Sequence, residues 1–215
     1  CFPLRLRGAL DVEALRGALS QVMGRHAALR ATFDAEGRQR IAEAAGLELP
    51  LVDLGPHTGA AREREILRIL DGESREPFDL AAGPPIRARL IREAEDVHTL
   101  VVTAHHIACD GWSAGVVLRD LAGLYSARTT GLPASLAEAA SYVDYVRAET
   151  SPEGARRRKA AEDYWVGRFA DLVPVVELPV DRPRPALRTF AGGQEVLAVD
   201  EDLYRAIKKL GAGLG

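Results

Sequence analysis

The sequence predicts an α/β fold in which helices flank one central, mixed β-sheet. Short stretches of alternating or continuous apolar residues, typical of strands, occur at 2–8, 86–92 and 98–106. Longer stretches between them place apolar residues three or four positions apart, as amphipathic helices do. With 215 residues, the chain is also long enough to bury a sizeable core.

The first elements follow from simple patterns. FPLRLRG at 2–8 alternates apolar and basic residues, which predicts a strand. Asp11 stands where a helix N-cap belongs, before a helix whose apolar stripe is Leu15, Leu19 and Val22. LRATF and RQRIAEA are then predicted to pair as strands around an acid-and-glycine turn at 34–37.

The middle of the chain predicts one more helix and two longer strands. Residues 59–74 combine an apolar face with an Arg and Glu face, and the turn formers of EPFDLAAGPP then predict a loop. IRARLIR at 86–92 alternates, so this strand should be half buried. HTLVVTAHH at 98–106 is apolar on both faces, as a central strand should be.

The remaining elements are mainly helical. Ser113 is predicted to cap a helix that carries Val117, Leu121 and Leu124 on one face. Two further helices are predicted near 141–149 and 153–170. The prolines of LPVDRPRPALRT then exclude regular helix or central strand, which predicts a crossing segment or linker. A last strand at 192–199 and a last helix at 200–210 follow.

Composition excludes several classes of function. A net charge of −3 and a pI near 6.0 give no electrostatic footprint for nucleic acid or an anionic membrane, and no apolar run reaches the length of a membrane span. Two cysteines make no disulfide framework, so we expect a reducing, cytoplasmic location. The chain has no initiator Met and opens within a predicted strand, so we expect it to be a piece of a longer protein.

The polar groups gather in AHHIACDGWS at 104–113, where the central strand should end. Neighbouring strand residues point to opposite faces, so one of His105 and His106 should be functional and the other structural. Asp110 is placed to orient an imidazole or to hold a distant arginine. Gly111 permits a tight turn or close approach of a substrate. A general base beside the free N–H groups of a helix N-terminus suits acyl transfer.

Three other interpretations compete with this one. A histidine is often only a hydrogen-bonded structural residue. Two histidines and Asp110 within six residues also suggest a metal site, but adjacent strand histidines diverge. Cys109 as a nucleophile is weaker still, because it is too close in sequence to both histidines to be oriented by them. A small buried residue is the expected role for Cys109.

Several motifs resemble one known family. HHIACDG at 105–111 matches the HHxxxDG motif of acyltransferases with the chloramphenicol-acetyltransferase-like fold. The further matches resemble the condensation domains of nonribosomal peptide synthetases and follow their order: GRHAALRATF, EPFDLAAGPPIRARL, DGWS, YVDY, YW and LPVDRPRP. The chain departs from the family pattern at Ala27, Ala31 and residues 146–148, and these changes leave the HHxxxDG stretch intact.

The resemblance implies an N-terminal lobe of such a domain, without the family's first motif. Residues 1–199 would form this lobe, and 200–215 would begin a truncated C-terminal lobe. In the family the site lies in a tunnel between two lobes, so the isolated lobe is expected to be inactive.

The resemblance also implies roles for individual residues. His106 would position, and secondarily deprotonate, the α-amine of the acceptor, and the Gly111 backbone would meet the reacting carbonyl. Asp110 would form a salt bridge with Arg25. The remaining residues expected to support the site structurally are His105, Arg30, Trp112 and Tyr142.

The implied reaction is peptide-bond formation between two carrier-bound thioesters. Both substrates would ride on 4'-phosphopantetheine, with no metal and no cofactor bound directly. The expected partners are carrier domains, the C-terminal lobe and a neighbouring adenylation domain. Two alternatives remain open: a non-catalytic lobe that docks carriers or a recruited enzyme, and a free-standing acyltransferase that uses coenzyme A.

Overall fold

The structure, a computed structural model, divides into two compact units, Cys1–Tyr164 and Trp165–Gly215. The described residues are 1–43, 46–171, 173, 179–183, 185–187, 189, 193 and 197–214.

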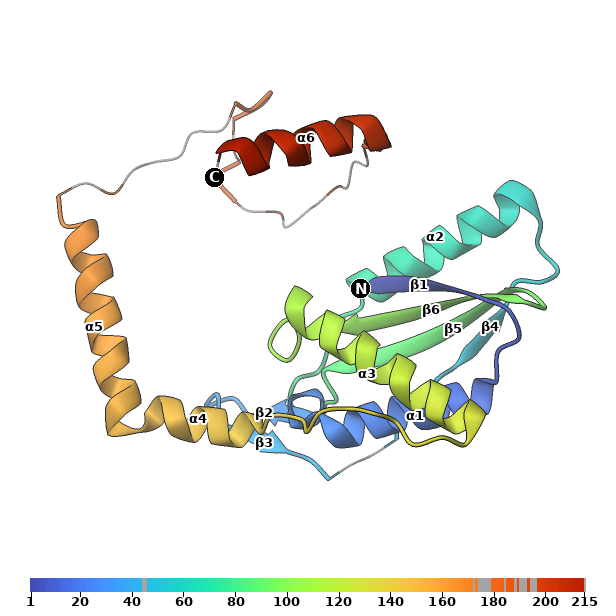
Figure 1. Cartoon of the computed structure of the whole chain (residues 1–215), viewed down its shortest axis with the longest axis horizontal. Coiled ribbons are helices and arrows are strands. Elements are labelled where there is room, and N and C mark those ends of the chain that lie inside the picture. Colours follow the sequence, from blue (N-terminus) through green and yellow to red (C-terminus); the bar gives the residue numbers. More distant parts are fainter. Residues whose placement is uncertain are drawn as a thin grey trace. The chain divides into compact units, whose positions relative to one another are not determined.

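The first unit is built on a four-stranded sheet with the order β1-β6-β5-β4 (Figure 1). Strands β1 (Phe2–Arg7), β6 (Val97–Ala104) and β5 (Ile86–Ala94) pair antiparallel, whereas β4 (Leu51–Asp53) runs parallel to β5. The sheet is therefore mixed, as predicted. β6 lies between β1 and β5 and is buried along most of its length, which confirms that it is a central strand.

Helices cover both faces of this sheet (Figure 1). Helices α1 (Val12–Arg25) and α3 (Gly111–Thr130) pack on one face. Their core partners from the sheet include Ala88, Leu90, Leu100 and Val102. Helix α2 (Gly59–Arg75) packs on the other face against a smaller cluster of Leu54, Ile91 and Val101. Alternate residues of β5 and β6 thus serve different helices, as the period of two requires.

A small second sheet follows α1. A short 3-10 helix, η1 (Ala27–Arg30), leads into β2 (Ala31–Phe33), which pairs antiparallel with β3 (Gln39–Ile41). Asp34 closes the turn between the two strands by accepting hydrogen bonds from the backbone and the side chain of Arg38. The predicted hairpin is confirmed, but η1 carries no pattern that would have predicted it.

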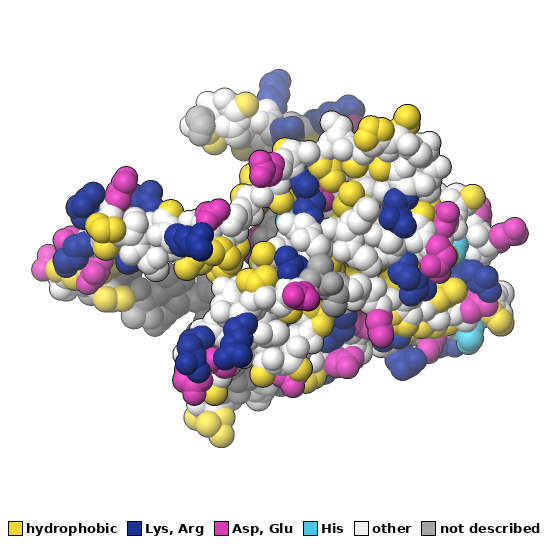
Figure 2. All heavy atoms as spheres, turned by 90° about the horizontal axis from the view of Figure 1, so that it is seen from below, with side chains coloured by type: hydrophobic (Ala, Val, Ile, Leu, Met, Phe, Trp, Pro, Cys, Tyr) yellow, Lys and Arg dark blue, Asp and Glu magenta, His cyan; other side chains and the backbone are white. Residues whose placement is uncertain are grey.

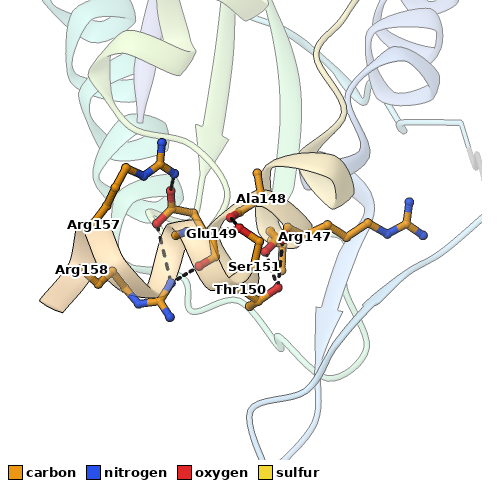
Figure 3. Close-up of polar contacts among 9 residues, drawn as sticks. Arg147, Ala148, Glu149, Thr150, Ser151, Arg157 and Arg158 are labelled. Carbon is orange, nitrogen blue, oxygen red and sulfur yellow. Dashed lines mark hydrogen bonds and ion pairs between the residues drawn. The ribbon is translucent and has the colours of Figure 1, made fainter.

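Helices α4 (Tyr142–Thr150) and α5 (Pro152–Arg168) meet at a one-residue corner (Figure 3). Ser151 donates its hydroxyl proton to the Ala148 carbonyl and accepts from the Gly154 N–H, so it ends one helix and caps the next. Arg157 and Arg158 reach back to Glu149 across the corner.

The second unit contains the end of α5 and helix α6 (Glu201–Leu214), for which Asp200 supplies an N-cap bond to the Leu203 N–H. This confirms the last predicted helix. Half of the predicted strand at 192–199 lies outside the described residues, and the described residues 193 and 197–199 are not in a strand.

The surface carries both signs of charge, and Figure 2 shows acidic and basic side chains interspersed over one face. Among the helices that the structure describes, none has the length and apolar character needed to cross a membrane.

Two predictions about elements need correction. β4 was not predicted, because it has only three residues and follows Pro50 without an alternating pattern. Helix α3 begins at Gly111 with Asp110 as its N-cap, not at Ser113. The Asp110 carboxylate accepts from the Ser113 N–H at 2.8 Å, so Ser113 lies inside the first turn.

Candidate active site

The stretch 104–113 joins the central strand β6 to helix α3. β6 ends at Ala104, a turn covers 106–108, and α3 starts at Gly111. Both histidines therefore lie beyond the strand. The sequence suggested that strand alternation points the two side chains to opposite faces. The structure shows instead that the hydrogen bonds of the turn give the two histidines different surroundings.

His105 is held by its backbone and its ring. Its N–H donates to the Pro85 carbonyl at 2.9 Å, and its own carbonyl accepts from the N–H groups of Ala108 and Cys109. The ring Nδ1 accepts from the Ile107 N–H at 3.0 Å. On its other side the ring meets Phe78 edge to face, with centroids 6.1 Å apart. His105 thus organises the turn.

His106 is exposed at the outer side of this turn. It lines a hollow of about 420 Å³ together with His105, Thr103, Phe78 and residues from the end of α2, Glu73 among them. The Thr103 hydroxyl is buried on this side and has no hydrogen-bond partner among the described residues. The site therefore has one exposed imidazole at the edge of an open hollow.

Asp110 does not pair with Arg25, and the expected salt bridge is wrong. One oxygen of the Asp110 carboxylate accepts from both the N–H and the hydroxyl of Ser113, at 2.8 and 2.7 Å. These bonds, the backbone one first, hold the pKa of Asp110 below its ordinary value. Asp110 is therefore an ionised helix cap at neutral pH, on a residue that is exposed to solvent.

Arg25 instead binds a carboxylate inside α3. Its Nε lies 2.8 Å from an oxygen of Asp120, and His26 Nε2 lies 2.9 Å from the same oxygen. Arg25 also donates to the Ala137 carbonyl. Burial raises the pKa of Asp120, but the hydrogen bonds from Arg25 and His26 outweigh it and leave the pKa lowered. Asp120 and His26 were missed by the sequence reasoning; the only available signal was the Arg-His pair of the GRHAALR motif.

Of the other residues expected at the site, some pack or form hydrogen bonds within the fold and others are exposed. Cys109 is buried, and burial raises the pKa of its thiol, which fits a packing role and not a nucleophile. Arg30 donates to the carbonyls of Met23 and Ala42 and ties α1 to the strand region after it. Trp112 is 86% exposed, so it has no packing role within the described residues. Tyr142 stacks on Tyr145 within α4.

Gly111 is the first residue of α3, so its own N–H has no partner within the helix, whereas the Ser113 N–H is bound by the Asp110 carboxylate. A Cβ placed on Gly111 would meet nothing within 4 Å. The backbone there is thus open to a ligand, and the positive end of the helix dipole favours an oxygen that gains negative charge.

The arrangement suits chemistry in which an amine attacks a carbonyl. It offers an imidazole that can hold or accept a proton and N–H groups that can stabilise an oxyanion. Among the described residues, no group of three His, Cys, Asp or Glu side chains is placed to hold a metal ion.

Comparison with known proteins gives the family. The chain belongs to the condensation domain family, whose model matches residues 2–213. It is 40% identical over 215 residues to chondramide synthase cmdD of Chondromyces crocatus, covering 97% of this chain and 5% of that protein.

Solved structures agree in fold. The X-domain from teicoplanin biosynthesis superimposes with a TM-score of 0.72 at 36% identity, over 86% of this chain and 41% of that one. The same X-domain in complex with OxyB gives a TM-score of 0.71. VibH, a nonribosomal peptide synthetase condensation enzyme, shares the fold with a TM-score of 0.64 at 23% identity, over 80% of this chain and 40% of VibH. The chain thus spans about two fifths of these solved chains and corresponds to one lobe of the chloramphenicol-acetyltransferase-like fold.

Proposed function

We propose that the full-length protein carrying this chain forms an amide bond between two thioesters held on carrier domains. The observation that carries the proposal is the exposed His106 ring, presented by a hydrogen-bonded turn at the edge of a hollow, next to the open N-terminus of α3. Membership of the condensation domain family supports the same reaction.

In this reaction the α-amine of the acceptor attacks the carbonyl carbon of the donor thioester. The C–N bond forms, the C–S bond breaks, and the proton lost by the amine passes to the leaving thiolate. A free α-amine has a pKa of about 7.7–8.0, so a modest assist, a hydrogen bond from its N–H to an imidazole nitrogen, is enough to keep it nucleophilic. His106 therefore acts first by positioning the amine and second by taking its proton, while the Gly111 N–H binds the carbonyl oxygen.

The substrates reach this site on 4'-phosphopantetheine arms, so the proposed partners are carrier domains. The C-terminal lobe would supply the other wall of the site, and a neighbouring adenylation domain would load the acceptor carrier. No cofactor bound by this chain takes part in the proposed reaction.

The test is direct transfer between carriers. The full-length protein is mixed with donor and acceptor carrier domains loaded with aminoacyl-phosphopantetheine, and the mass of the acceptor carrier is followed. We expect it to gain the donor acyl group while the donor carrier returns to the free thiol. Release of free amino acid without any gain of mass on the acceptor would contradict the proposal.

A second candidate is a docking lobe without catalysis. It is favoured by the 36% identity to an X-domain whose complex with OxyB has been solved. Tight binding of a partner protein together with no acyl transfer from any loaded carrier would favour docking. The intact HHIACDG stretch is the feature that favours catalysis over docking.

A further inference from the structure

A chain of contacts runs from the end of α2 through β5 to the turn that carries His106. It starts at Glu73, a buried carboxylate whose two oxygens accept from Arg87 Nε at 2.9 Å and Arg89 Nε at 2.6 Å. Burial raises the pKa of Glu73, but the hydrogen bonds from Arg89 and Arg87 outweigh it, so the pKa stays below its ordinary value. Glu73 is therefore a fixed negative charge on the buried side of α2, near the end of the helix.

Arg87 is anchored by three hydrogen bonds. Besides the Glu73 carboxylate, its guanidinium donates to the carbonyls of Glu73 and Glu76 at 2.6 and 2.7 Å. A guanidinium held at three oxygens has little freedom to swing, because its planar fork presents fixed donor directions. Its position is set by the fold and not by solvent.

The same guanidinium lies over the ring of Phe78, with its central carbon 4.2 Å from the ring centroid. A cation over an aromatic face is attracted to the ring, more strongly when water is excluded. Phe78 stands in the loop after α2, and the cation holds the ring in one orientation. Without Arg87, the loop alone would have to orient it.

The Phe78 ring in turn contacts the His105 ring, at an interplanar angle of 86°. His105 uses its Nδ1 to accept from the Ile107 N–H, so the ring cannot turn without breaking a bond of the turn. An imidazole that accepts at Nδ1 carries its remaining proton on Nε2. The orientation of His105 and the shape of the turn are thus coupled.

We propose that Arg87 and Phe78 are positioning residues for the amide-forming site: they hold the His105 ring, and through it the turn that presents His106. The inference rests on the proposed function of His106 but concerns residues outside the HHIACDG stretch. Neither residue touches the reacting atoms. We therefore expect them to affect kcat, because a displacement of a catalytic group by about 1 Å can lower the rate about 100-fold.

The variants at Phe78 distinguish the effect of the aromatic ring from that of side-chain volume. The variant at Arg87 distinguishes the effect of the guanidinium geometry from that of the positive charge. Phe78→Leu keeps an apolar side chain but removes the ring, and Phe78→Tyr keeps the ring. Arg87→Lys keeps a positive charge beside Glu73 but loses the fork. Arg92→Lys is the control, because Arg92 also pairs with a carboxylate, that of the exposed Asp53, at the other end of β5 and away from Phe78.

The readout is the amide-forming rate of the full-length protein, with KM for each carrier and the melting temperature measured alongside. We expect Phe78→Leu and Arg87→Lys to lower kcat by about 10- to 100-fold, with KM and melting temperature nearly unchanged. Phe78→Tyr and Arg92→Lys should keep the parent rate. An unchanged kcat in Phe78→Leu, or an equal loss in Phe78→Tyr, would overturn the proposal.

A second measurement decides the point if Phe78→Leu does not fold. Protein labelled with ¹⁵N and ¹³C in histidine should show His105 with an unprotonated Nδ1, and Arg87→Lys should shift its ring signals. Signals that do not move in Arg87→Lys would contradict the coupling. If the parent protein forms no amide, the proposed function fails, while the His105 signals still decide whether Arg87 and Phe78 orient that ring.

Discussion

A substitution at Gly111 should affect the binding of substrate without affecting the stability of the fold. Nothing lies within 4 Å of where its Cβ would be, and alanine is favourable in a helix, so the fold tolerates a methyl group there. We expect Gly111→Ala to keep the melting temperature of the full-length protein and to lower the single-turnover rate at least tenfold, because the methyl group meets the reacting carbonyl.

The matched control is Gly115→Ala, one turn further along α3, where a Cβ also meets nothing within 4 Å. It should retain the parent rate. Equal rates for the two variants would show that the Gly111 backbone does not approach the substrate.

Asp120 of α3 links that helix to the end of α1. Its carboxylate is 6% exposed and accepts from both Arg25 and His26. Asp120→Asn leaves a buried cation with a weaker acceptor, so we expect a loss of about 3 kcal/mol in the free energy of unfolding, measured by urea denaturation. Asp34→Asn, which removes the carboxylate of a turn pair with the exposed Arg38, should cost much less. Equal losses in the two variants would argue against a special role for Asp120.

The lowered pKa of Asp120 also sets the sign of a pH dependence. A carboxyl whose pKa is lower in the folded state stabilises the protein above its unfolded pKa of about 3.9. This contribution is lost as the pH falls through the folded value. The difference in unfolding free energy between the parent and Asp120→Asn should therefore be constant near neutral pH and shrink below about pH 4. A difference that stays constant down to pH 2 would contradict this assignment.

The sequence predicted an ion pair for Arg25 but assigned the wrong partner. Asp110 and Asp120 both lie on or beside α3, and motif order alone cannot tell at which level the end of α1 meets that helix. The Asp110 carboxylate accepts a hydrogen bond from the Ser113 N–H at the start of the helix instead. Only the packing of α1 on α3 shows that Arg25 lies at the level of Asp120.

The corner between α4 and α5 leaves no room for a side chain at Gly154. A Cβ on Gly154 would lie 2.3 Å from the Glu149 carbonyl oxygen and 2.5 Å from that of Ala148. Since these are backbone atoms, Gly154→Ala should force the corner open. We expect a loss of at least 1–3 kcal/mol in the unfolding free energy, measured by urea denaturation.

Gly167→Ala in the same helix is the control, because a Cβ there meets nothing within 4 Å. It should be neutral or stabilising by up to about 1 kcal/mol. A loss in Gly167→Ala as large as in Gly154→Ala would mean that the corner itself is not the cause.

The elements show which signals a single sequence carries. β6 and α1 were predictable, because a continuous apolar run and a capped amphipathic stripe are determined by their own residues. β4 was not, because a three-residue strand is stabilised by pairing with β5 rather than by its own pattern. The relation of Phe78 to His105 was equally hidden, since 27 positions in the sequence separate two rings that are in contact.

The first unit, Cys1–Tyr164, is a sheet covered on both faces by helices, with the candidate site at the end of its central strand. The fold class and the family were predictable from ordered motifs, and the comparisons confirm both. The orientation of His106 was not, because it depends on a turn whose hydrogen bonds come from backbone groups that no side-chain pattern records. A boundary between lobes at residue 199 stays a prediction; the contacts divide the chain after Tyr164.

The central claim is that His106 serves amide formation. Its most direct test is the single-turnover rate of transfer between loaded carrier domains, compared for the parent full-length protein, His106→Ala and His57→Ala. His57 is an exposed histidine before α2 and serves as the matched control. We predict a loss of about 10²–10⁴-fold for His106→Ala and the parent rate for His57→Ala. A parent rate in His106→Ala would contradict the account.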